Sequence, residues 1–181
     1  MPPHVAVPAF HISRLSFSTR VLMTLFILSS AGGSVFVSTA VYHVRTGWTS
    51  GGAEEHFRGN EGLPPDQVKE LKVRMPDEQL ADVIHPHAYM IPLFLFTLGH
   101  MLSLCSLDER TKIALYVASF LGGAGVTFAP WLVRAAPGWG WALQASMFLF
   151  LASLVALSAI PLLQMWGIWR AGGRTTAPLD L

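Results

Sequence analysis

The chain has 181 residues, of which 52% are hydrophobic and only 13% are charged, and its formal net charge is +1 at pH 7. The mean hydropathy of +0.47 is typical of an integral membrane protein. A charge this small, without a basic stripe, argues against a nucleic-acid partner. The single cysteine, Cys105, excludes an internal disulfide, a cysteine-based metal site and a covalently attached c-type haem.

Four apolar stretches are long enough to cross about 30 Å of hydrocarbon, which takes about 20 helical residues. They are 21–42, 86–106, 113–133 and 141–169, and no Asp, Glu, Lys or Arg lies inside them. The six tryptophans lie near the ends of these stretches, as expected for rings at the lipid headgroups. We therefore predict an all-α, polytopic membrane protein that forms a bundle of four transmembrane helices.

The predicted organisation is a cytoplasmic tail over 1–20, a membrane domain over 21–170 and a second cytoplasmic tail over 171–181. An outer loop, 44–84, is too short to bury a core by itself and should lie against the bundle mouth. Its glycine-rich first half predicts irregular backbone. Pro64 and Pro76, each followed by acidic residues, predict two short helices in its second half. The first apolar stretch exceeds the 7–15 residues of a signal-peptide core, so we interpret it as a retained helix.

The predicted orientation follows from the basic residues nearest the spans. The positive-inside rule places both termini of this predicted multi-pass protein in the cytoplasm. The residues that carry this assignment are Arg14, Arg20, Arg110, Lys112, Arg170 and Arg174. Four basic residues in the outer loop reduce the asymmetry.

Glycines near the middle of two spans allow two interpretations. Gly32 and Gly33 lie in the first span, and Gly122, Gly123 and Gly125 lie in the third. Small residues let helix backbones approach closely, because packing drives helix association in lipid. They also make room for a flat cofactor between helices, and the sequence leaves both readings open.

Histidines gather at the predicted outer ends of the first two spans. His85-Pro86-His87 begins the second span, with Pro86 as its first helical residue, and His43 ends the first. An imidazole in a membrane segment costs free energy, so its presence there requires an explanation. Three histidines with a carboxylate or water suit Zn²⁺, Cu²⁺ or Fe²⁺, and two facing histidines suit a haem b. We predict His43, His85 and His87 as cofactor ligands, with His56 completing a metal site; structural capping and proton handling remain open alternatives.

His100 requires a separate explanation. It lies 15 residues beyond His85, or about 22 Å along a helix, which is too far for one site. Four roles are left open: a hydrogen bond to a serine or to a carbonyl freed by a proline, a proton relay, a hydrogen bond to a quinone, and a cofactor ligand. No Ser–His–Asp arrangement, phosphate-binding loop or His-Glu-x-x-His motif is present, so we predict no catalytic residue.

These motifs resemble a group of uncharacterised bacterial inner-membrane proteins with four helices. The matching segments are His56-Phe57-Arg58-Gly59-Asn60, His85-Pro86-His87 and Gly99-His100. Members carry an outer loop after the first span and a His-x-His at the start of the second, and some have a c-type haem site in that loop. The resemblance implies work near respiratory or photosynthetic electron transfer. This chain departs from it by lacking Cys-x-x-Cys-His.

The predicted function is therefore that of an inner-membrane subunit that binds a metal ion or one haem b at its outer face, in association with membrane electron transfer. Its expected partners are lipids and other membrane-protein subunits. The alternative is a cofactor-free accessory subunit of a larger bioenergetic or transport complex.

Overall fold

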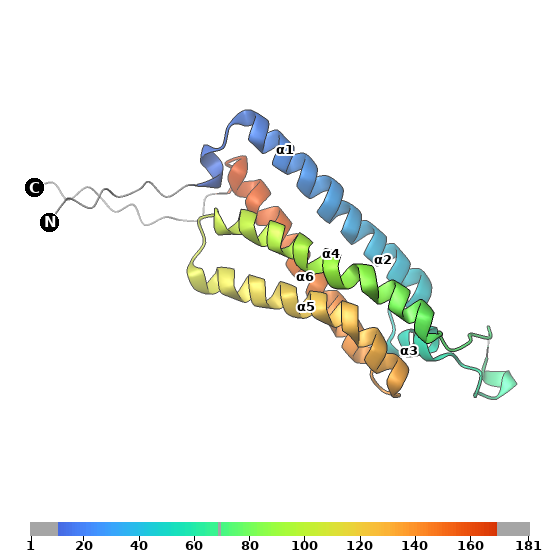
Figure 1. Cartoon of the computed structure of the whole chain (residues 1–181). Coiled ribbons are helices and arrows are strands. Elements are labelled where there is room, and N and C mark those ends of the chain that lie inside the picture. The colour runs from blue at the N-terminus through green and yellow to red at the C-terminus, as the bar shows by residue number, and fades with distance from the viewer. Residues whose placement is uncertain (1–10, 69, 170–181) are drawn as a thin grey trace, which may run out of the picture.

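The computed structural model describes residues 11–68 and 70–169, and within these ranges the ordered elements are all helices. Figure 1 shows long helices packed side by side, with a short helix, α3, at the end of the bundle opposite η1 (Ile12–Arg14). The all-helical fold is as predicted. The predicted terminal tails lie wholly or partly outside the described residues.

The first span is one continuous rod of 30 residues, Phe17–Thr46. It consists of α1 (Phe17–Ile27), a π-helical turn η2 (Leu28–Gly32) and α2 (Gly33–Thr46). The rod begins at Ser16, whose side chain accepts a hydrogen bond from the Thr19 amide, as a helix N-cap does. It ends at Gly47, whose φ of +58° is the left-handed conformation that favours glycine.

The segment after the rod differs from its prediction. Residues expected to be irregular form α3 (Ser50–Arg58), because Thr49 caps its first turn with a 3.0 Å hydrogen bond from the Gly52 amide. The helix expected to begin at Pro64 is reduced to one turn, η3 (Pro65–Gln67), and residues 70–76 form no regular secondary structure. Hydrogen bonds to both ends of the Asn60 side-chain amide hold this stretch in place.

Three long helices complete the bundle: α4 (Asp77–Ser103), α5 (Glu109–Ala135) and α6 (Gly140–Met165). The second helix predicted in the outer loop is the beginning of α4, so α4 starts before the span expected at residue 86. Pro86 therefore lies inside the helix, and His85 is not its cap. Because both His85 and His87 lie within this helix, its geometry fixes the direction in which each side chain points.

The two groups of glycines behave differently. A Cβ on Gly122 would lie 2.7 Å from the Phe150 amide nitrogen, and one on Gly125 would overlap the Ser146 side chain. These glycines let α5 and α6 approach closely, as small residues do in membrane bundles. A Cβ on Gly32 or Gly33 would meet no atom within 4 Å. The first span therefore has open space beside its glycines.

Three of the helical segments are long and apolar enough to cross a membrane: Phe17–Thr46, Glu109–Ala135 and Gly140–Met165. They agree with three of the four predicted spans. The helix α4 has the length but is not in this group; its three histidines and two prolines make it less apolar. Many large hydrophobic side chains on the outer surface of the bundle are exposed, as a lipid-facing surface requires.

Two hydrophobic clusters stabilise the bundle. One, around Leu98 and Leu154, lies toward η1, where the Ile12 amide donates to the Leu104 carbonyl at 3.1 Å. The other includes Tyr42 and Phe57 and lies beneath α3. The second cluster forms one wall of the site described next.

Candidate functional site

A cavity of about 390 Å³ lies beneath α3, between α2, α4, α5 and α6. Its walls are mostly apolar, and one side carries polar groups. The apolar lining is Val37, Val41, Phe57, Met75, Val83, Val126, Pro130, Leu143 and Met147. The polar side consists of Tyr42, Arg45, Thr46, His56 and His87, with Ser38 at the edge. A mostly apolar hollow with a few convergent polar groups is the usual form of a small-molecule site.

Tyr42 carries the clearest sign of a missing partner. The residue is 6% exposed, and its buried hydroxyl forms no hydrogen bond of normal geometry, although the Thr46 side chain lies close to it. Its ring is held edge-on against Trp48, with 4.9 Å between the ring centroids. Trp48 adopts a φ of +60°, which is rare for a non-glycine residue, and its carbonyl accepts a 2.7 Å hydrogen bond from Gln144. A buried hydroxyl left unpaired costs about 1–3 kcal/mol, so the site favours a ligand that pairs with it.

Arg45 and His56 form the mouth of the cavity. The guanidinium Nη1 of Arg45 lies 3.3 Å from the His56 Nε2, so the arginine donates to that ring nitrogen. Arg45 takes part in none of the ion pairs among the described residues. Burial lowers the pKa of His56, and the positive charges of Arg45 and Lys72 lower it further. His56 is therefore neutral at pH 7, while the guanidinium keeps the mouth positive.

His87 reaches the same cavity from α4. Its Nδ1 lies within hydrogen-bond distance of the Val83 carbonyl, and a carbonyl can only accept. We therefore assign the proton of the neutral ring to Nδ1, which leaves Nε2 as an acceptor. The structure thus brings together two of the predicted ligands, His56 and His87, around one hollow.

His43 and His85 lie elsewhere, because of helical geometry. Tyr42, Arg45 and Thr46 share the cavity face of α2, whereas His43 is exposed and does not line the cavity. On α4, His85 and His87 are two residues apart, or about 200° around the helix. The exposed ring of His85 packs edge-on against Tyr89, with 5.3 Å between the centroids.

The four predicted metal ligands do not form one cluster. Within residues 11–68 and 70–169, no group of three or more His, Cys, Asp or Glu side chains is placed to hold a metal ion. The guanidinium of Arg45 also disfavours a metal ion at His56, because it donates a hydrogen bond to the imidazole and repels a cation. His100 is exposed near the end of α4, and its ring stacks on Phe96 with 6.4 Å between the centroids.

A larger groove adjoins the cavity. It has a volume of about 690 Å³ and lies between the first span and α4. Val37, Ser38 and His87 line both hollows, so the two are neighbours along the same pair of helices. The other residues of the groove are Phe26, Ser29, Ser30, Gly33, Ser34, Met90, Ile91, Leu93, Phe94, Thr97 and Phe150.

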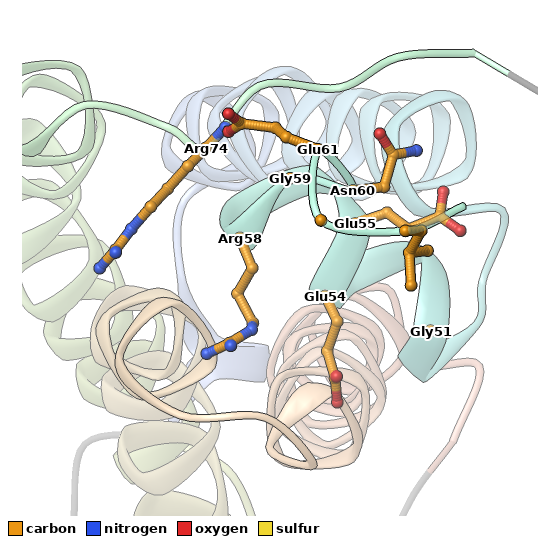
Figure 2. A pocket seen from close by; sticks show the side chains of 10 residues that line it. Gly51, Glu54, Glu55, Arg58, Gly59, Asn60, Glu61 and Arg74 are labelled. Carbon is orange, nitrogen blue, oxygen red and sulfur yellow. The ribbon is translucent and has the colours of Figure 1, made fainter. Parts of the chain in front are cut away.

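A separate polar pocket lies on the outer side of α3. Figure 2 shows Glu54 and Arg58 extending from α3 toward the α5–α6 turn. The Glu54 carboxylate accepts from the Gly138 amide at 2.9 Å, and Arg58 donates to the Arg134 carbonyl at 3.3 Å. Its other acidic side chains, Glu55 and Glu61, bind Lys72 and the Arg74 amide. These charges already have protein partners, so we interpret the pocket as the joint that fixes α3 over the bundle.

The comparison with known families decides the class of the protein. A family described as a transmembrane helical domain matches residues 47–171. The chain belongs to this family. No curated protein and no solved structure matches it. The family match covers α3 to α6, and with them His56 and His87, whereas Tyr42 and Arg45 lie before the matched region. The cavity is thus shared between the family's domain and the first span.

Sequence reasoning identified part of this site and missed the rest. The predicted ligands include His56 and His87, but the prediction gave Arg45 no part in the site. The available signal was helical spacing: residues 42, 45 and 46 share one face at the end of a span, and residue 43 does not. The sequence did not show where α4 starts. Without that position, it could not be decided whether His85 or His87 faces the cavity.

Proposed function

We propose that this chain is an integral membrane protein whose cavity beneath α3 binds a small amphipathic molecule through a hydrogen-bond-accepting head. The single observation that carries the proposal is the mostly apolar cavity into which several polar groups converge, the buried Tyr42 side chain among them. Arg45 supplies further donors and a positive charge, and the apolar walls accommodate the hydrocarbon beside the head. The predicted use of the histidines changes accordingly: His56 orients Arg45, and His87 offers an acceptor.

Photolabelling tests this proposal directly. The probe is octanoate with a diazirine on its chain, incubated with the full-length protein and located by peptide mass spectrometry. We expect labelling of the segments around Tyr42 and Phe57, and a loss of that labelling in Tyr42→Phe and Arg45→Gln. Tyr89→Phe is the matched control, because that ring is exposed on α4. Labelling spread evenly over the bundle surface would contradict a cavity site.

We place this cavity at the outer end of a four-span protein of the bacterial inner membrane. The helix α4 is proposed as the fourth span: its 27 residues reach about 40 Å, and its exposed residues include Tyr89, Met90, Leu93 and Phe96. Both termini are proposed to be cytoplasmic, with the segment around α3 outside. Labelling of single cysteines by a membrane-impermeant reagent in whole cells tests this: Gly51→Cys should react and Ser16→Cys should not, in a Cys105→Ser background.

Haem binding is a second candidate, because His56 and His87 line one cavity. The free Nε2 of His87 is a suitable ligand for iron, but His56 would first have to release Arg45. A reduced-minus-oxidised visible spectrum with metal analysis tests both the haem and the predicted site at His43, His85 and His87. A haem band, or one metal ion per chain, would establish a cofactor and favour a role in electron transfer.

The accessory-subunit alternative also has a supporting observation. His85 and His100 are exposed on α4 among apolar side chains, where a lipid chain offers an imidazole no hydrogen bond. A neighbouring subunit packed on this face would provide one. Co-purification of another membrane protein that is lost in a His85→Leu, His100→Leu double variant would support this role, and an unchanged co-purification would contradict it.

A further inference from the structure

We propose that the cavity and the adjoining groove form one site for an anionic phospholipid, with its headgroup beneath α3 and one acyl chain between the first span and α4. This inference rests on the proposed function and extends it by naming the class of ligand. Three features support it: the groove continues from the cavity, its surface is apolar, and its mouth is positive.

The groove suits a hydrocarbon chain. Ser29 and Ser30 donate their hydroxyl hydrogens to carbonyls of their own helix, and Thr97 does the same on α4 at 2.9 Å. These residues therefore present little free polarity to a ligand. Apart from Ser34, Ser38 and His87, the other side chains of the groove are aliphatic or aromatic, and Gly33 leaves open space where a side chain would fill it.

The length of the groove matches one leaflet. From His87 to Thr97 the helix α4 advances ten residues, or about 15 Å at about 1.5 Å per residue. The hydrocarbon core of a bilayer is about 30 Å thick, so one acyl chain reaches about half of that distance. A lipid whose head lies at His87 would thus place its chain end near Thr97, at mid-membrane.

Charge favours an anionic head. No carboxylate lines the cavity, while Arg45 lines it and is outside every described ion pair. A neighbouring hollow that shares His56 with the cavity is lined by Arg74 and by Lys72, whose amine is paired with Glu55. A phosphate would pair with the guanidinium of Arg45, which lines the cavity. A hydroxyl of a glycerol head would find an acceptor in the His87 Nε2.

The test uses phosphatidylglycerol with a diazirine near the end of one acyl chain, at low abundance in phosphatidylcholine vesicles that contain the full-length protein. We expect label on the α2 and α4 segments that line the groove. Gly33→Phe should remove most of it, because the new ring occupies the groove without overlapping protein atoms at its Cβ. Gly32→Phe is the matched control, since Gly32 is equally open but lines neither hollow. Arg45→Gln should reduce the labelling about tenfold, the effect of losing one charge-assisted hydrogen bond.

Several outcomes would overturn the inference. If octanoate labels the cavity but the phospholipid chain does not label the groove, or Gly33→Phe labels as wild type does, the lipid assignment is wrong and the proposed function stands. If neither probe labels its site, both fail. Equal labelling by the matching phosphatidylethanolamine would refute selection for an anionic head. Displacement of the lipid by an equal concentration of soluble glycerol phosphate would identify a site for a free phosphate compound instead.

Discussion

Removal of the Tyr42 hydroxyl should stabilise the lipid-free protein. A buried hydroxyl that forms a hydrogen bond contributes about 0.5–1.5 kcal/mol, and Tyr→Phe normally loses that amount. The Tyr42 hydroxyl is buried without a partner, so it imposes a desolvation cost of about 1–3 kcal/mol that Tyr42→Phe removes. The expected change in the free energy of unfolding is therefore a gain of about 1 kcal/mol or more.

The measurement is reversible unfolding of delipidated protein in mixed micelles, followed by circular dichroism. Tyr89→Phe, on an exposed ring, should change the free energy of unfolding by less than about 0.5 kcal/mol. A Tyr42→Phe variant that is less stable than the wild type without lipid would show that the hydroxyl has a protein partner, and the reasoning would be refuted.

Three further predictions concern packing, pH and the joint at α3. Gly122→Ala should destabilise the bundle by about 1–3 kcal/mol, because its Cβ would press on the backbone of Phe150; chemical unfolding measures this, and a neutral effect would contradict the close α5–α6 approach. The pKa of His56 is lower in the folded than in the unfolded protein, so stability should fall as the pH drops below about 6.5, where the unfolded state binds the proton first. His56→Gln should flatten that part of the stability profile, and an unchanged profile would exclude His56 as its source. Glu54→Ala should cost about 1 kcal/mol by freeing the Gly138 amide, and it should raise hydrogen exchange at the α5–α6 turn; unchanged exchange would show that this contact does not hold the turn.

The helical fold could be predicted because its signals are local and strong. Long apolar stretches without charges indicate membrane helices at whatever position they occur, and three of the four predicted stretches coincide with helices of the required length and composition. The fourth differs because His85, His87 and Pro86 lie at its start, and proline inside a helix resembles proline at the beginning of one. The helix α3 was not predicted, because its glycines are typical of irregular backbone and the helix depends on the Thr49 cap.

The site could be predicted only in part, because a cavity depends on contacts between distant segments. Histidine composition drew attention to the α3 end of the bundle, where His56 and His87 line one hollow. The sequence could not show that Arg45 occupies the His56 ring, or that the Tyr42 hydroxyl lacks a partner. Both facts require the angle at which α2, α3 and α4 meet. They change the expected ligand from a cation to a molecule that accepts hydrogen bonds.

Native mass spectrometry of the protein extracted gently from its own membrane tests the central claim most directly. The account predicts one tightly held adduct per chain with the mass of an anionic phospholipid, and a loss of that adduct in Arg45→Gln. An adduct with the mass of haem or of a metal ion would contradict the account and restore the histidine cofactor site. A chain that carries no adduct in both proteins would show that the cavity does not retain the proposed ligand.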